Sequence, residues 1–186
     1  LFAKASASNR NSEHDLFADD DDLASSWTPD DRSEVTLADH SAWVKRAVEK
    51  IASRCLPQEF FDPLCHAAYW HDVGKLDERF QLVLRQGDEI ANGFGEPLAK
   101  SAFVPTSPAR REAIREAAGL PKGFRHEFLS FQLVERHAGL SAGEHAADLV
   151  LHLVASHHGH ARPFAPVVPD SEPPAVSGRH DGIVIA

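Results

Sequence analysis

Hydrophobic residues recur at helical spacing along most of the chain after residue 36. In one segment the positions i, i+3, i+4 and i+7, which share one face of a helix, hold Leu64, Ala67, Ala68 and His71. The pattern predicts six helices, at residues 37–54, 58–71, 76–86, 108–118, 127–138 and 142–157. The predicted fold class is therefore all-α, a helical bundle.

Glycine and proline separate these helices. Pro57 breaks the chain after the first helix, and Gly74 follows the second helix where a left-handed C-cap is usually needed. Residues 87–108 hold three Gly and three Pro and are predicted to form a long loop. Five prolines after residue 162 exclude further regular structure until residues 182–186, which fit either a strand or a cut helix.

Composition and charge divide the chain in two. Its 186 residues, 42% of them hydrophobic, suffice for one globular domain with a core. Of the net charge of −9, residues 1–39 carry −7, which leaves −2 for the rest. We therefore expect an acidic flexible linker at residues 1–35 and a folded domain at residues 36–186. The nearly neutral body would hold a long nucleic acid poorly by itself, because phosphate contacts supply most non-specific affinity.

The sequence indicates a cytoplasmic protein without a membrane segment. It has no run of 18 apolar residues and no signal peptide. Cys55 and Cys65 are interpreted as buried free thiols in a reducing compartment. Because the chain starts at Leu1 and contains no methionine, we expect it to be a piece of a longer polypeptide.

Several histidines stand at the ends or edges of the apolar stripes, where a solvated histidine is not expected. Buried polar groups need partners, and a set of five histidines and one aspartate finds them most simply in metal ions. The set is His40, His71, Asp72, His126, His157 and His158. Its mixed nitrogen and oxygen donors suit iron, manganese, cobalt, nickel or zinc, and six ligands are too many for one tetrahedral zinc.

Other side chains are interpreted as structural. Trp43, Tyr69 and Trp70 are predicted to lie in the core or at its edge rather than to stack on bases. His152 is predicted to pack in the core or to support a ligand, and His180 to have no role.

Four sequence blocks follow one another in the order H…HD…H…HH. They are Leu37-Ala-Asp-His40-Ser, His71-Asp-Val-Gly-Lys75, Arg125-His-Glu-Phe-Leu-Ser130 and Ser156-His-His-Gly-His-Ala-Arg162. With these blocks, residues 36–163 resemble the HD superfamily of metal-dependent phosphohydrolases, and more narrowly the HD nuclease domain of the type I CRISPR-associated helicase-nuclease. The resemblance implies two divalent transition-metal ions, the first held by His40, His71 and Asp72 and the second by Asp72, His126, His157 and His158.

The resemblance also bears on residues near the ligands. Lys75 becomes a candidate catalytic residue, and Arg125 and Arg162 become candidate phosphate-binding residues. The alternative for Lys75 and Arg162 is a solvated cation at a helix end. Family members usually carry a further aspartate on a later helix, and only Asp170 and Asp181 remain here for that role.

The function that the resemblance implies is a metal-dependent nuclease that hydrolyses phosphodiester bonds of single-stranded DNA. A helicase domain on the same or a companion chain would feed it, after recruitment by an RNA-guided CRISPR surveillance complex. Two alternatives remain open. One is an HD-family phosphohydrolase of nucleotides or cyclic dinucleotides, and the other is a degenerate HD module that only binds.

Overall fold

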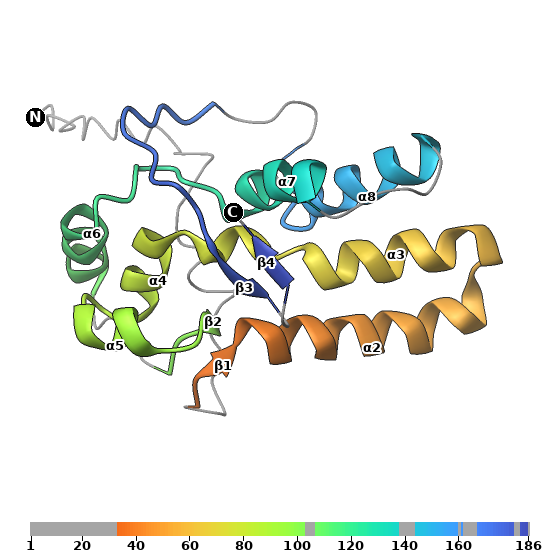
Figure 1. The fold of residues 1–186 in the computed structure, drawn as a ribbon, viewed down its shortest axis with the longest axis horizontal. Coiled ribbons are helices and arrows are strands. Elements are labelled where there is room, and N and C mark those ends of the chain that lie inside the picture. The colour runs from red at the N-terminus through yellow and green to blue at the C-terminus, as the bar shows by residue number, and fades with distance from the viewer. Residues whose placement is uncertain are drawn as a thin grey trace, which may run out of the picture.

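Packed helices make up most of the described chain. The computed structural model describes residues 33–102, 107–137, 144–159, 161, 167–180 and 183–185. Its helices are α2 (Leu37–Cys55), α3 (Gln58–Trp70), the 3-10 helix η1 (Val73–Leu76), α4 (Glu78–Leu84), α5 (Glu89–Phe94), α6 (Pro108–Ala117), α7 (His126–His137) and α8 (Glu144–Ser156). In Figure 1, α3 lies between α2 on one side and α7 with α8 on the other, and the shorter helices gather at one end. The predicted all-α class is confirmed. No described helix has the length and apolar character that a membrane span requires.

Short strands form two antiparallel pairs, of which the first joins distant parts of the chain and the second is local. These pairs are β1 (Val35–Thr36) with β2 (Leu98–Lys100) and β3 (Gly178–His180) with β4 (Ile183–Ile185). The prediction of a loop at residues 87–108 is wrong in part, since α5 and β2 lie within it. The closing segment forms a strand and not a cut helix. Strand β1 begins at the last residue of the predicted linker, and residues 1–32 lie outside the described chain.

Local capping fixes where the site-bearing helix α2 begins. Thr36 adopts an extended conformation, and its Oγ1 accepts a hydrogen bond from the backbone N–H of Asp39 at 3.1 Å. The acidic side chain of Asp39 also stands in the first turn, where it interacts favourably with the helix dipole. The helix therefore starts at Leu37, which places His40 in its first turn.

A hydrophobic core holds the long helices together around the His71-Asp72 pair. It consists of Leu37, Ala67, Trp70, Val73, Leu76, Ala99, Leu133, Val134, Val150, Val154 and Ile185. A second cluster lies under the shorter helices and consists of Phe80, Val83, Leu84, Leu98, Ile114 and Leu120. Full burial of each large side chain contributes roughly 1.5–3 kcal/mol. Because Trp70 and Val73 flank the His71-Asp72 pair, the packing that holds α3 in place also fixes that pair.

The buried face of α2 differs from the predicted one. Trp43 and Ile51 are 63% and 61% exposed, although the sequence pattern placed Trp43 in the core or at its edge. The buried positions of the helix are instead Leu37, Ser41 and Ala52. These lie on the side that packs against α3, while Trp43 lies outside that face. The apolar stripe read from the sequence was broader than the contact that α3 makes.

Three further side chains also have surroundings that differ from those expected from the sequence. His180 is buried in β3, where its ring packs against those of Tyr69 and Trp70 at centroid distances of 4.8 and 5.3 Å. His152 is exposed on α8. Cys65 is a buried free thiol as predicted, whereas Cys55 is exposed.

An ion-paired arginine ties the C-terminal segment to α4. Arg79 Nη2 lies 2.9 Å from a carboxylate oxygen of Asp170 and 2.9 Å from one of Asp77. The hydrogen bond from Arg79 holds the pKa of Asp170 below its ordinary value. Because the pKa is lower in the folded than in the unfolded state, the stabilisation is present at neutral pH. It is lost as the pH falls from the unfolded pKa through the folded one.

We predict that Asp170→Asn lowers the free energy of unfolding at pH 7 by up to about 1 kcal/mol. The difference from wild type should shrink as the pH is lowered below about 4, where the wild-type carboxyl group also becomes neutral. Urea unfolding at neutral and acid pH measures both values, with Asp148→Asn on the exposed side of α8 as the control. A deficit that persists unchanged in acid would contradict the prediction.

Candidate metal centre

Asp72 stands where α3 ends and η1 begins, at the centre of a group of histidines. Its side chain is almost fully buried, although it carries an acidic group. His71 is the residue directly after α3, so the helix end itself brings this imidazole beside the carboxylate. The two oxygens of the Asp72 carboxylate face different sets of partners.

The Oδ2 oxygen of Asp72 faces two histidines and a lysine. Nε2 of His40 lies 3.3 Å from this oxygen, and Nε2 of His71 lies 3.4 Å from it. Lys75 Nζ lies at 2.9 Å and also donates to the carbonyl oxygen of Ala99 at 3.2 Å. His40 comes from α2 and His71 from the end of α3, so the packing of these two helices assembles this half of the centre.

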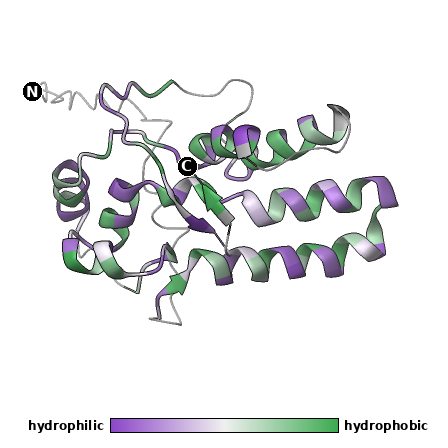
Figure 2. Cartoon of the chain, in the orientation of Figure 1, coloured by the Kyte–Doolittle hydropathy of each residue, from purple (hydrophilic) through white to green (hydrophobic). Residues whose placement is uncertain are grey.

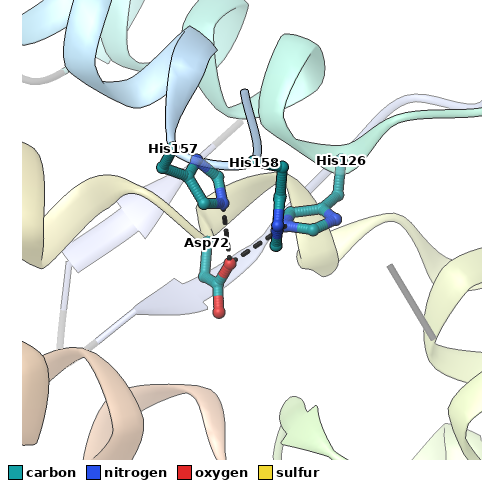
Figure 3. A group of neighbouring side chains, drawn as sticks. All are labelled: Asp72, His126, His157 and His158. Carbon is teal, nitrogen blue, oxygen red and sulfur yellow. Dashed lines mark hydrogen bonds and ion pairs between the residues drawn. The ribbon is translucent and has the colours of Figure 1, made fainter. Parts of the chain in front are cut away.

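The Oδ1 oxygen of Asp72 faces histidines from the opposite helix layer. Nε2 of His126 lies 3.0 Å from Oδ1, and Nε2 of His157 lies 3.6 Å from it. His158 completes this set, with its Nε2 atom 3.3 Å from Nε2 of His126. Figure 3 shows His126 and His157 joined to the same oxygen of Asp72, with the ring of His158 beside that of His126. His126 begins α7, and the histidine pair follows the end of α8.

The hydrogen bonds of two histidines indicate how their rings are protonated. Nδ1 of His71 lies 2.8 Å from the carbonyl oxygen of Ala68, and Nδ1 of His157 lies 2.7 Å from that of Val154. Because a carbonyl oxygen only accepts, each Nδ1 carries a proton, and in the neutral ring each Nε2 presents a lone pair. Both Nε2 atoms therefore direct a lone pair toward the Asp72 carboxylate. A cation between them would remove this repulsion, so the residues fit metal ions.

The charge states of the cluster agree with ligand chemistry. Burial alone would raise the pKa of Asp72, but its neighbours, above all the ammonium of Lys75, outweigh it and hold that pKa well below its ordinary value. Asp72 is thus a carboxylate at neutral pH. Burial lowers the pKa of His157 although Asp72 opposes the shift, which favours a neutral ring. Metal ions bind the deprotonated form of both residue types.

A close backbone contact holds the His-Asp turn against α7. The backbone N–H of Gly74 donates to Ser130 Oγ at 2.8 Å, and both groups are buried. A Cβ atom on Gly74 would stand 2.1 Å from the carbonyl oxygen of His126, so only glycine permits this approach. The prediction that Gly74 is a left-handed C-cap is wrong, since it is not among the residues with positive φ. Ser130 had no predicted role, although its position four residues after His126 places both on one helix face.

One family comparison decides the identity of this arrangement. A family model described as "Cas3, HD domain" matches residues 30–176, which is most of the chain. The chain belongs to the Cas3 HD domain family. It is therefore a hydrolase domain of the HD phosphohydrolase type from a CRISPR system. No curated protein and no solved structure gives a match.

The Cas3 HD domain brings together all six predicted ligands. Within the described residues, two groups of donor atoms lie close enough to hold an ion, and Asp72 belongs to both. The groups are His40, His71 and Asp72, and Asp72, His126, His157 and His158. They are the same two sets that the sequence resemblance implied.

The cations predicted around the Cas3 HD centre have different surroundings. Lys75 is buried beside Asp72, so the alternative of a solvated cation is wrong. Arg125 is also buried, and its Nη1 lies 3.8 Å from the buried carboxylate of Glu127. This guanidinium faces an internal carboxylate, and its role as a phosphate-binding residue stays a prediction. Arg162 lies outside the described residues.

The distal aspartate implied by the resemblance has no counterpart among the described residues. Asp170 faces Arg79 and belongs to neither group of donor atoms, so it does not replace the missing ligand. Asp181 lies outside the described residues.

Proposed function

We propose that this chain is a metal-dependent nuclease that hydrolyses phosphodiester bonds of single-stranded DNA in type I CRISPR interference. The observation that carries the proposal is the division of the Asp72 carboxylate between two sets of histidines. Oδ2 faces His40 and His71, and Oδ1 faces His126 and His157. A carboxylate that faces two donor sets suits a pair of ions better than one ion.

Two divalent transition-metal ions, drawn from manganese, iron, cobalt, nickel and zinc, would fit this donor set. His40, His71 and Asp72 would hold one ion, and Asp72, His126, His157 and His158 would hold the other. Such a pair supplies Lewis-acid stabilisation of the attacking and leaving oxygens in phosphoryl transfer.

Backbone carbonyl groups orient two histidine rings of the proposed centre, and Lys75 adds a positive charge beside them. The carbonyl oxygens of Ala68 and Val154 fix the rings of His71 and His157 with Nε2 directed inward. Lys75 donates to the Asp72 carboxylate and places a buried positive charge at the centre. This charge favours the negative charge that develops on a phosphate during hydrolysis. Lys75 is therefore the proposed catalytic cation, with Asp72 as the shared ligand.

The charge of the chain supports delivery of the substrate by a partner. Residues 40–186 carry a net charge of only −2 and have no excess of cations with which to hold a duplex. We propose that a helicase domain, on the same or a companion chain, supplies a single strand after recruitment by an RNA-guided CRISPR surveillance complex. Tethering to such a motor would raise the local concentration of the strand and relieve weak intrinsic affinity.

Metal content tests the two-ion assignment. The wild-type chain should bind about two ions, and His40→Ala and His157→Ala should each reduce the content to about one, because each removes a ligand from a different set. Elemental analysis after dialysis against limiting manganese measures this. His152→Ala, which removes an exposed histidine from α8, is the matched control and should leave the content unchanged. Identical content in all four proteins would refute the assignment.

Substrate choice tests the nuclease assignment. With added manganese the chain should cut circular single-stranded DNA, should leave blunt duplex DNA largely intact, and should lose activity in EDTA. Its rate should also fall with rising salt, because salt weakens the contacts between cationic side chains and the phosphates of the strand. Activity confined to mononucleotides or cyclic dinucleotides would favour the alternative phosphohydrolase. Binding without hydrolysis under every metal would favour a degenerate module.

A further inference from the structure

The outer face of α2 carries an exposed tryptophan followed by three exposed cations. Trp43, Arg46, Lys50 and Arg54 are spaced by three or four residues, so they form one stripe along the helix. We call these four residues the basic-aromatic row. Trp43 is 63% exposed, which is unusual for a side chain of its size and apolar character. Figure 2 shows hydrophilic bands recurring along the same helix.

The cations of the row are not neutralised by neighbours. Among the described residues, none of Arg46, Lys50 and Arg54 forms an ion pair with a carboxylate. The one ion pair within α2 joins Lys45 to Glu49, which lie on another side of the helix. Asp39 lies on the row's side but stands in the first turn, where it accepts a hydrogen bond from Thr36 Oγ1 at 2.8 Å. Within the part of the chain that the structure describes, the row is thus a strip of cations without ion-pair partners.

The row lies on an outer helix and leads to the metal centre. Figure 1 shows α2 at the edge of the molecule, with α3 on its inner side. His40, a ligand of the proposed centre, stands three residues before Trp43 on the same helix, about 4.5 Å along its axis. Arg54 stands about 21 Å from His40 along that axis. Successive cations are about 6 Å apart, which is comparable to the length of one extended nucleotide.

We propose that the basic-aromatic row binds single-stranded DNA and guides the strand to the metal centre. This inference rests on the proposed nuclease function, since it assigns the path by which that substrate reaches the site. Cations along a groove or ridge hold successive phosphates, and an aromatic side chain stacks on a base of any sequence. Both groups occur here in one line that starts next to a ligand.

The chemistry of the row favours a single strand over other occupants. Trp43 can stack only on a base that is not already paired and stacked within a duplex. An acidic protein surface would satisfy the cations, but it would give no reason for the line to begin beside His40. The row also explains how a nearly neutral domain holds DNA, because its local charge is far more positive than its average.

Binding of labelled oligothymidylate to the metal-free whole chain tests the row without interference from cleavage. The triple variant R46A/K50A/R54A should weaken binding roughly 10-fold or more at low salt. It should also reduce the slope of log affinity against log salt by about 2, as expected for three lost phosphate contacts. The matched control R110A/K122A/R136A removes three exposed cations from other elements and should change affinity by less than about twofold.

The proposed stacking of Trp43 is tested separately, with one strand that has bases and one that lacks them. Trp43→Ala should weaken binding of oligothymidylate roughly 10-fold with no change in the salt slope. It should have no effect on binding of an abasic strand, which has phosphates but no bases. Phe94→Ala, which removes a 92% exposed ring from α5, is the control and should affect neither ligand.

The outcomes separate this inference from the proposed function. If the triple variant of the row and the triple control variant weaken binding equally, only the net charge of the chain matters. The proposed role of the row in DNA binding is then refuted. If the row variants bind DNA like wild type but no longer bind a helicase partner, the face is a protein-docking surface and the proposal is also refuted. If the row variants lose DNA binding, the row is supported. A wild-type chain that binds in this way yet cleaves no phosphodiester with any metal would refute the nuclease function alone.

Discussion

Replacing Asp72 with asparagine will abolish metal binding and phosphodiester hydrolysis while leaving the fold nearly intact. The amide keeps the size of the carboxylate but loses the negative charge and one of the two oxygens that face the histidine sets. Because this side chain belongs to both donor groups, one substitution affects both proposed ions. We expect a loss of at least about 1000-fold in rate, which corresponds to several kcal/mol of lost charge stabilisation.

Cleavage of circular single-stranded DNA, metal content and thermal unfolding in EDTA together measure this effect. Asp62→Asn, an exposed change within α3, is the matched control and should behave like wild type. Asp72→Ala should unfold more easily than Asp72→Asn, because it leaves the buried ammonium of Lys75 without the carboxylate that faces it at 2.9 Å. Removing one partner of a buried pair typically costs about 3–5 kcal/mol. Near-wild-type cleavage by Asp72→Asn with added manganese would rule out the assigned role.

Replacing Gly74 with alanine will destabilise the domain severely and disrupt the metal centre. The new Cβ atom would stand 2.1 Å from the carbonyl oxygen of His126 and 2.6 Å from the backbone nitrogen of Ser130. Both are backbone atoms of α7, so no side-chain rotation relieves the contact. The turn that carries Asp72 must then move away from His126. We expect a loss of about 3 kcal/mol or more in the free energy of unfolding, at the upper end of overpacking effects.

Urea unfolding in EDTA measures this loss without any contribution from bound metal. Gly93→Ala on α5 is the control, because a Cβ atom there meets no atom within 4 Å and the residue lacks positive φ. It should be neutral or slightly stabilising. A Gly74→Ala protein with wild-type stability and metal content would show that the turn and α7 are not held in contact as described.

The local pattern of the sequence was sufficient for most helices. Apolar spacing, prolines and glycines predicted the ends of α2, α3, α6, α7 and α8 to within about two residues. These signals are sufficient because each acts over one or two helical turns. The same approach failed between residues 87 and 108. Helix α5 has no buried residue and β2 has three residues, so neither carries a periodic pattern long enough to read.

Burial depends on partners and could not be read from the pattern alone. The stripe on α2 appeared to include Trp43, but α3 covers a narrower face and leaves this ring exposed. His180 follows a proline-rich segment and seemed unstructured, yet β3 carries it against Tyr69 and Trp70, more than a hundred positions earlier in the chain. In both cases the deciding contact comes from a segment that the local sequence does not contain.

The sequence by itself determined which residues could hold metal, because ligand chemistry belongs to the side chain. The order H…HD…H…HH named His40, His71, Asp72, His126, His157 and His158 before any contact was known. Only the tertiary structure decided how they meet, because the two oxygens of Asp72 face helices that are distant in sequence and joined by packing. The tertiary structure also determined which cationic side chains are buried and which are exposed. Lys75 and Arg125 are turned inward toward buried carboxylates, whereas the row on α2 stays exposed because only its inner side is packed.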